Sequence, residues 1–373
     1  MQSGSDGFLR PEIKHELCTG CGKCEKSCPV LNPPTLYRNE QPKVYACWHK
    51  DEAVRRQSSS GGAFSAIAEL ILEKNGIIFG AAYDDNLHVH HMGVELADDL
   101  DRLRRSKYVQ SEIGGTFRQV EEQLWQGRQV LFVGTPCQVA GLYAFLGVEN
   151  ENLLTLDFVC HGVPAPGVFR KYIDWLGQLF KMDVQEFNFR DKRQGWRNIT
   201  ASISLVDGKR KQLKGHQNCF YHGFIDGVTL REACFACAYM KIPRVADFSM
   251  ADFWGVGDRE PFAYADEKER GISLLLINSC RALAWMGSLE ERMLLVERTL
   301  QEASLRNVHL CQPAKRPMQH KDFLRDAVSR DYAYLERHYM RPTLKRRVVQ
   351  FVKENFNGAL LRGLRNFHKT LGL

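Results

Sequence analysis

The chain has 373 residues, of which 44% are apolar and 25% charged, and it carries twelve cysteines and a formal net charge of +7. This length and composition suffice for a substantial core divided among two or three domains. Because no segment resembles a signal peptide and no apolar run approaches the roughly 20 residues that span a bilayer, we expect a cytoplasmic protein with reduced, metal-holding thiols, and not a secreted disulfide framework.

The most specific motif stands near the N-terminus. It has the C-x2-C-x2-C-x3-C-P spacing of bacterial ferredoxins, with cysteines at Cys18, Cys21, Cys24 and Cys28 before Pro29. Soft thiolates select iron-sulfur clusters, whereas zinc sites usually come as two separated pairs. Gly20 and Gly22 let the loop wrap closely and turn its N–H groups toward sulfur. We therefore predict a partial ferredoxin-like module with a 4Fe-4S cluster over residues 1–35; a zinc knuckle or a disulfide pair is the alternative.

The motif does not determine which residue is the fourth ligand of this cluster. In two-cluster ferredoxins the last cysteine of such a run ligates the other cluster, and a second run supplies the missing ligand. Only one run is present here. Cys28 could fold back to ligate a lone cluster, Cys47 could serve as the fourth ligand in its place, or an upstream half of the ferredoxin module is absent from this chain. We favour the last, because residues 6–11 resemble the middle of a ferredoxin module.

Beyond a proline-rich connector the hydrophobic period alternates between that of strands and that of helices. The pattern predicts, in chain order, strand 44–48, helix 62–74, strand 76–83, helix 115–126, strand 129–133, helix 137–146, strand 153–159 and helix 166–180. A hairpin-like region follows over 184–214 with its turn at 206–209, and then strands near 248–254 and 272–278. This alternation predicts an α/β fold with a partly parallel sheet, and we assign 44–310 to one catalytic domain.

The net charge is concentrated in the last segment. From Arg341 onward eight basic residues face a single acidic one, Glu354, so the rest of the chain is neutral overall and we expect no nucleic-acid partner. Apolar residues at largely helical spacing predict a helical, basic amphipathic segment over 318–373. Two readings are open: peripheral contact with the inner face of a membrane, or docking on the protein's own core.

A second group of cysteines lies where chemistry is often found. Cys137 and Cys160 each follow a predicted strand, and the carboxyl ends of strands in open α/β sheets form the ligand crevice. Cys234 and Cys237 form a CxxC pair that completes four thiolates for a second cluster, although a lone CxxC also suits a zinc half-site or a redox pair. The remaining cysteines are expected to be ordinary buried residues, with Cys219 a candidate substitute ligand: Cys47, Cys219, Cys280 and Cys311.

Two loops suggest a flavin or phosphate site. Residues 58–62, Ser-Ser-Ser-Gly-Gly, lead into a predicted helix, whose N-terminal N–H groups and dipole favour a phosphate, although Ser-Gly is also a routine helix cap. Residues 106–111 offer a cation, an aromatic ring and hydroxyls in one loop. The candidate flavin ligands are Ser59, Ser60, Gly61, Gly62, Lys107 and Ser111.

In their order, these motifs resemble the coenzyme F420 hydrogenase/dehydrogenase beta-subunit family over about residues 44–280. The motifs are Ser-Ser-Ser-Gly-Gly62, Ser106-Lys-Tyr-Val-Gln-Ser, Gly134-Thr-Pro-Cys-Gln, Cys160-His-Gly-Val-Pro, Phe189-Arg-Asp-Lys with Gly195-Trp, the CxxC pair and Asp252-Phe-Trp-Gly. The resemblance implies an FAD-containing iron-sulfur flavoprotein; relatives reduce or oxidise the deazaflavin coenzyme F420, and a plant relative reduces a hydroxymethyl chlorophyll. Members with an N-terminal ferredoxin module usually carry two cysteine runs, whereas this chain has one.

Together these features predict an oxidoreductase that relays electrons between one or two 4Fe-4S clusters and a two-electron organic substrate, or coenzyme F420, through FAD. The expected partners are a redox protein such as ferredoxin, or a partner subunit, and a small organic substrate. His161 is the candidate catalytic proton donor, with hydrogen bonding to a cluster sulfur as the alternative, and Asp252 is a supporting or merely solvated carboxylate. A non-catalytic electron-transfer subunit and a zinc-stabilised interaction protein are the competing functions.

Overall fold

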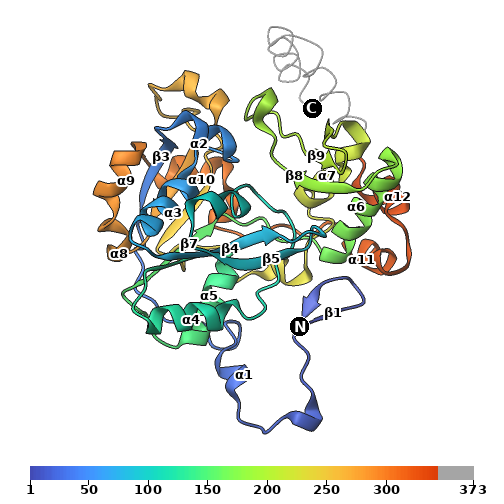
Figure 1. The fold of residues 1–373 in the computed structure, drawn as a ribbon, viewed down its shortest axis with the longest axis horizontal. Coiled ribbons are helices and arrows are strands. Elements are labelled where there is room, and N and C mark those ends of the chain that lie inside the picture. The colour runs from blue at the N-terminus through green and yellow to red at the C-terminus, as the bar shows by residue number, and fades with distance from the viewer. Residues whose placement is uncertain (343–373) are drawn as a thin grey trace.

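The computed structural model describes residues 1–342, and a mixed eight-stranded sheet lies at its centre (Figure 1). The strands follow the order β13 (Met293–Arg298), β3 (Lys43–His49), β12 (Ser273–Ile277), β11 (Phe248–Asp252), β7 (Leu153–Phe158), β6 (Val130–Gly134), β4 (Ile77–Tyr83) and β5 (Val89–Val94). The neighbours β11, β7, β6 and β4 run parallel, and the outer pairs are antiparallel. The prediction of an α/β fold with a partly parallel sheet is confirmed.

Helices cover both faces of this sheet. On one face α3 (Ala63–Glu73) and α9 (Met286–Arg292) pack against Leu131 and Val133, and on the other α4 (Thr116–Trp125) and α5 (Pro136–Leu146) pack against Val130 and Phe132. Because successive strand side chains point to opposite faces, adjacent residues of β6 contribute to two different cores. That double burial explains why the central strands read as continuous apolar runs.

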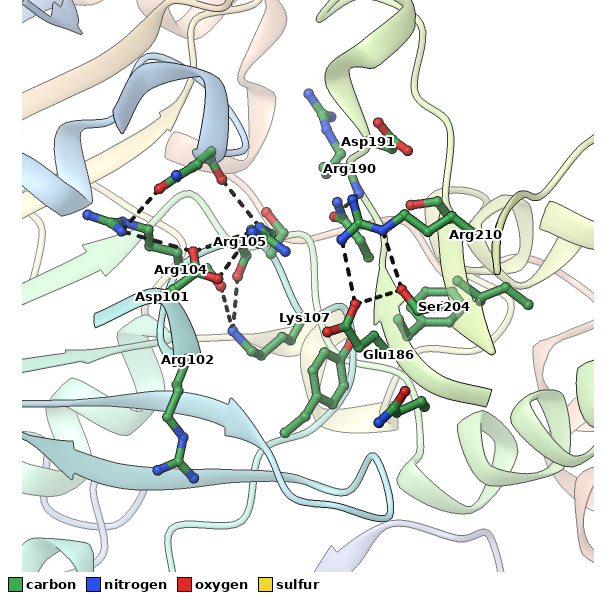
Figure 2. Close-up of a pocket in the computed structure, with 18 of the residues that line it drawn as sticks. Asp101, Arg102, Arg104, Arg105, Lys107, Glu186, Arg190, Asp191, Ser204 and Arg210 are labelled. Carbon is green, nitrogen blue, oxygen red and sulfur yellow. Dashed lines mark hydrogen bonds and ion pairs between the residues drawn. The ribbon is translucent and has the colours of Figure 1, made fainter. Parts of the chain in front are cut away.

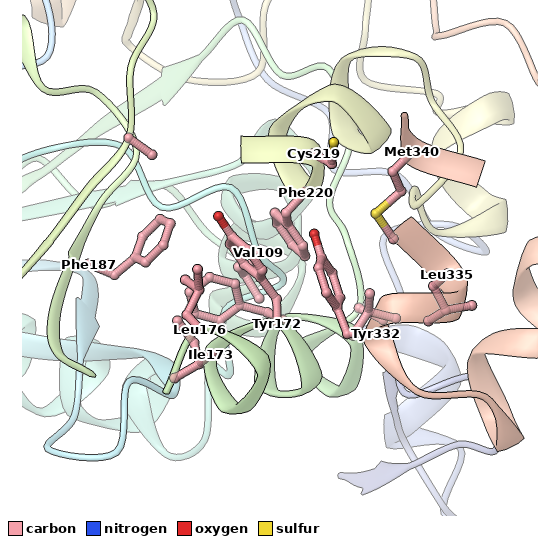
Figure 3. Packing of buried hydrophobic residues seen from close by; sticks show 14 of the residues in the cluster. Val109, Tyr172, Ile173, Leu176, Phe187, Cys219, Phe220, Tyr332, Leu335 and Met340 are labelled. Atoms are coloured by element: carbon pink, nitrogen blue, oxygen red, sulfur yellow. The ribbon is translucent and has the colours of Figure 1, made fainter. Parts of the chain in front are cut away.

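A second lobe is built around aromatic side chains. It contains the antiparallel sheet β8 (Val184–Asn188), β9 (Ser202–Leu205) and β10 (Arg210–Gln212), and the helices α6 (Pro166–Phe180), α7 (Cys219–Ile225), α11 (His320–Ser329) and α12 (Tyr332–Leu335) followed by the π-helical turn η8 (Glu336–Met340). Figure 3 shows its core, where the Tyr172 and Phe220 rings stack with their centroids 5.2 Å apart. Residues 320–340 pack into this core. Residues 343–373 of the predicted basic segment lie outside the described residues, and so do both readings of its role.

The sequence pattern did not predict two strands of the large sheet. β5 is an edge strand in which the adjacent polar residues His90 and His91 interrupt the apolar alternation, and β13 follows α9 without any intervening turn residue. Several short elements were also not anticipated: β1 (Gln2–Ser3), β2 (Leu9–Arg10), α1 (Lys23–Lys26), α2 (Glu52–Gln57), α8 (Cys280–Leu283) and α10 (Leu300–Arg306). None of the helices within residues 1–342 has the length and apolar character needed to cross a bilayer.

Candidate functional site

The N-terminal cysteines lie in an exposed loop. We call residues 10–28 the outer cysteine loop; the three leading cysteines, Cys18, Cys21 and Cys24, are exposed and Cys28 is half-buried. Gly20 and Gly22 have φ of 68° and 67°, in the left-handed region that glycine adopts readily. The Lys23 backbone N–H and then the Thr19 hydroxyl lower the pKa of the Cys21 thiol. The loop therefore directs donors at sulfur, which suits an anionic thiolate ligand.

The other cysteines divide into two groups. Cys47 is enclosed in the core between β3 and α3, where burial raises the pKa of its thiol, so the structure gives it no route to the outer cysteine loop. Cys219 lies in the aromatic core, and burial raises its pKa to about 12. The prediction of burial is wrong for Cys280 and Cys311, which are exposed because each lies at the end of a short surface helix.

Two cysteines follow the carboxyl ends of adjacent parallel strands. The pairing of β6 with β7 places Gly134 opposite Asp157, so the segments leaving the two strands start side by side. Cys137 stands in the first turn of α5, with its Sγ 3.1 Å from the hydroxyl of the capping residue Thr135. Cys160 follows β7, and its Sγ accepts the Gly162 N–H at 3.3 Å.

The CxxC segment packs against the loop that carries Cys160. The Arg231 N–H donates to the Val163 carbonyl at 2.9 Å. Gly162 has a φ of 125°, and a Cβ added there would lie 2.9 Å from a Leu230 methyl carbon and 3.2 Å from the Cys234 Cβ. Only glycine allows the two loops to approach this closely.

The four predicted inner cysteines form one electrostatic group, which we call the inner thiol site: Cys137, Cys160, Cys234 and Cys237. Burial, and then the thiols of Cys234 and Cys137, raise the pKa of Cys160, and burial raises that of Cys234 to about 12. The Cys137 side chain reaches solvent, yet the protein around its sulfur still raises its pKa. Cationic iron would stabilise the thiolates that such surroundings disfavour.

The described residues form no site for a single metal ion. Among residues 1–342 no three His, Cys, Asp or Glu side chains converge closely enough to hold one ion. A 4Fe-4S cluster takes one thiolate at each of four irons, so its ligands need not meet at a single point. The four thiols of the inner thiol site match this ligand count.

His161 is held by its neighbours on both sides. Its Nδ1 lies 2.6 Å from His309 Nε2, and its Nε2 lies 3.1 Å from the carbonyl oxygens of Phe224 and Ile225. Burial and then His309 lower the pKa of His161 to about 4, so the ring is neutral at pH 7. A role as proton donor stays a prediction, and these contacts favour a positioning role beside Cys160.

A basic cleft of about 960 Å³ opens between the two lobes. One wall comes from α2, the end of β4 and residues 101–107, and the other from the β8–β10 sheet and residues 190–193 (Figure 2). Nine basic and five acidic side chains line it. A cleft with this excess of cations attracts anionic ligands.

Arg190 is the most confined cation of the cleft. It is 4% exposed, its Nη1 lies 3.2 Å from an Asp252 carboxylate oxygen, and its Nη2 has no hydrogen-bond partner of good geometry among the described residues. Asp252 also accepts a hydrogen bond from Trp196 Nε1 at 2.9 Å, so this carboxylate positions Arg190 and is not merely solvated. The hydroxyl of Tyr83, another lining residue, is likewise unpartnered within the described chain. Buried polar groups normally have a hydrogen-bond partner, so these two are candidate contacts for a bound ligand or an ordered water.

Of the six predicted flavin ligands, Lys107 is the one that lines the cleft. Its ammonium donates to three consecutive backbone carbonyls, the shortest bond being 2.8 Å to Arg104, and burial lowers its pKa to about 7. Ser59 reaches the cleft indirectly, because its hydroxyl accepts the N–H of the lining residue Ser106. Ser60 and Ser111 use their hydroxyls within the protein, on the Ile272 carbonyl and on His91.

Sequence reasoning missed most of the cleft cations. Arg104 and Arg105 directly precede the Ser-Lys-Tyr loop, and Arg190 and Lys192 stand within the Phe-Arg-Asp-Lys motif, whose residues carry no local sign of a ligand site. Lys192 donates to the carbonyls of Arg55 and Ser60 at 2.6 and 2.7 Å. This lysine therefore ties the second lobe to the Ser-Gly loop.

Known proteins resemble both parts of the chain. Residues 11–31 match a 4Fe-4S binding domain, and residues 127–303 match the model of the C-terminal part of the coenzyme F420 hydrogenase/dehydrogenase beta subunit. The F subunit of F420H2 dehydrogenase from Methanosarcina mazei is 27% identical over 151 residues, which are 39% of this chain and 41% of that protein. The chain thus aligns with less than half of this relative.

A chain of the F420-reducing [NiFe] hydrogenase complex from Methanosarcina barkeri is similar in structure, with a TM-score of 0.48 and 14% identity over 81% of this chain and 92% of that one. The ordered motifs and the match over residues 127–303 agree with each other. The chain therefore carries the C-terminal domain of the coenzyme F420 hydrogenase/dehydrogenase beta-subunit family over residues 127–303 and a 4Fe-4S binding motif over residues 11–31.

Proposed function

We propose that this protein is an iron-sulfur flavoprotein oxidoreductase that relays electrons between 4Fe-4S clusters and a two-electron organic substrate through FAD. In this assignment Cys18, Cys21 and Cys24, with Cys28 as the candidate fourth ligand, bind an outer cluster. The inner thiol site binds a second. Flavin bound in the basic cleft would supply the exchange between one-electron and two-electron chemistry.

The proposal rests on one observation above all: the cleft and the inner thiol site are joined by packed side chains. Tyr108, next to Lys107 of the cleft, stacks on Phe224 with ring centroids 4.7 Å apart. The Phe224 ring meets the His161 ring edge-on at 5.1 Å, and His161 directly follows Cys160. These ring contacts form a continuous path of side chains between the cleft and the inner thiol site.

The cleft residues suit a dinucleotide. The excess of cations in the cleft offsets the charge of a diphosphate, and Arg190 Nη2 and the Tyr83 hydroxyl are donors that lack a partner of good geometry among the described residues. The helix α3 begins at Ala63 after Gly62, which has no side chain to cap it, and its first N–H groups could receive an anion, as the Ser-Gly motif predicts. Ser59 and Gly62 thus stay candidate ligands beside Lys107, whereas the N–H and carbonyl of Gly61 already bond to the Ser273 hydroxyl and the His49 N–H.

Coenzyme F420 is the substrate that we propose first, because both the family and the relative from Methanosarcina mazei are named after it. A ferredoxin-like protein or a partner subunit would exchange electrons with the outer cluster. A non-catalytic electron-transfer subunit is the competing function, and it would show no turnover of a small substrate without a partner enzyme.

The test is anaerobic purification followed by measurement of iron, sulfide and flavin and then reduction by dithionite. We expect a yellow-brown protein with about eight irons per chain, as two 4Fe-4S clusters require, and with one FAD that is reduced together with them. Stoichiometric zinc without sulfide would refute the proposal. Clusters and FAD with no turnover of coenzyme F420 or of an artificial two-electron acceptor would favour the electron-transfer subunit.

A further inference from the structure

The outer cysteine loop is anchored at its N-terminal end to the segment that carries Cys160. Phe8 is fully buried in the aromatic core, and the Gln110 side-chain amide pairs with both the N–H and the carbonyl of Leu9, at 2.9 and 3.1 Å. The Gln110 backbone N–H donates to the Pro164 carbonyl at 3.0 Å. Pro164 ends the Cys-His-Gly-Val-Pro loop, so this anchor is attached to the segment that carries Cys160.

The second anchor lies at the other end of the loop. The hydroxyl of Tyr239, a residue 9% exposed, donates to the Pro29 carbonyl. Tyr239 stands two positions after Cys237. This hydrogen bond holds Pro29, the residue after Cys28, beside the segment that carries the CxxC pair.

Packing around Pro29 supports the same placement. A Cβ added at Gly141 of α5 would lie 3.9 Å from the Pro29 ring, and the first turn of α5 carries Cys137. Farther along the connector, Arg38 donates to the Tyr143 hydroxyl of α5 at 3.0 Å and to the Val245 carbonyl at 3.1 Å. The chain after Cys28 is therefore fixed against the elements that present the inner thiols.

Between these anchors the loop leaves the body of the protein, and Figure 1 shows it as the segment around α1 below α4 and α5. We propose that Gln110 and Tyr239 are positioning residues that hold the outer cysteine loop beside the inner thiol site, so that one electron passes directly from the outer to the inner cluster within a single chain. This inference rests on the proposed function, because it requires both clusters.

The step needs no proton and no bond cleavage. A one-electron donor, a ferredoxin-like protein or dithionite in the test, reduces the outer cluster; the inner cluster is then reduced as the outer one is oxidised. Without the two anchors the outer loop would move relative to the inner site, since no hydrogen bond joins residues 11–28 to the two lobes within the described chain.

The test compares the unsubstituted chain with three variants, all of them carrying both clusters. Tyr239→Phe removes the hydroxyl and keeps the ring, and Gln110→Ala removes the other anchor. Tyr37→Phe is the matched control, because it removes a hydroxyl from a side chain that is 93% exposed in the same connector. Paramagnetic resonance of the dithionite-reduced protein reports magnetic interaction between the clusters, and the rate of lysine-directed proteolysis within residues 10–28 reports opening of the loop.

We expect interacting spectra in the unsubstituted chain and in Tyr37→Phe. In Tyr239→Phe we expect a weaker magnetic interaction between the clusters and about fivefold faster proteolysis of the outer cysteine loop. Loss of one hydrogen bond produces a change of about this size when the loop must open before it is cleaved. Two clusters with no magnetic interaction, or identical behaviour of Tyr239→Phe and Tyr37→Phe, would overturn the inference while leaving the proposed function intact. Fewer than two clusters in the unsubstituted chain would overturn both.

Discussion

The two cysteine sites differ in how the chain builds them. The outer site comes from one run of 11 residues, Cys18 to Cys28, and needs only two glycines and a turn of helix to arrange its sulfurs. The inner site joins two strand ends and a CxxC loop spread over residues 137–237, and it exists only when β6 and β7 are paired. A local site depends on loop conformation, whereas an assembled site depends on the fold.

Substitution of the assembled site should have the largest effect. In Cys160→Ser we expect iron to fall from about eight to about four per chain, because serine presents a harder and more basic ligand than thiolate. Cys234→Ser should lose the same paramagnetic signal. Iron, sulfide and resonance measurements check this, and retention of both clusters in Cys160→Ser would refute the shared site.

Substitution in the outer site should remove the outer cluster and leave the inner site unchanged. Cys21→Ser is expected to lose the outer cluster, again about four irons, while the inner signal and bound flavin are kept, since no strand or helix of the sheet depends on this loop. Thermal unfolding should be nearly unchanged. Simultaneous loss of both signals would contradict the independence of the two sites.

The cleft is also an assembled site, and Arg190 tests it. Arg190→Met should weaken FAD binding by about 10- to 100-fold, the range expected for a buried charge-assisted hydrogen bond, and it leaves Asp252 without its ion-pair partner. Quenching of flavin fluorescence during titration of the flavin-free protein measures this. Arg197→Met is the matched control, because the Arg197 side chain is 55% exposed. Equal affinities of the two variants would place the flavin elsewhere.

The smallest expected effect is a pH dependence. Burial lowers the pKa values of Lys107 and Lys192 to about 7 from the ordinary 10.5, so both ammonium charges are lost as the pH rises through neutrality. The phosphates of a dinucleotide are diesters and keep their charge in this range. FAD affinity should therefore fall several-fold between about pH 6 and 9, and Lys107→Met should flatten the profile. A profile that is flat in the unsubstituted protein would contradict this electrostatic role.

Much of the fold is encoded in local patterns. The alternation of periods identified the buried strands near β4, β6 and β7 and the helices between them, because burial on one or two faces imposes a period on consecutive residues. The cysteine spacing identified the outer site for a similar reason, since its ligands lie within a turn or two of each other. The convergence of Cys137 with Cys160 was also predictable, because parallel strands end at the same sheet edge.

The tertiary structure alone decided the rest. Gln110 and Tyr239 carry no local signal, and they become anchors only because packing brings them to Leu9 and Pro29, 101 and 210 positions away. The cleft likewise gathers Lys107, Arg190 and Arg210 from two lobes, whereas the hydroxyls of Ser60 and Ser111 turn to partners within the protein. Sequence determines which residues are cationic or thiol-bearing, but contacts across such separations depend on strand register and on the packing of helices against the sheet, which are properties of the whole chain.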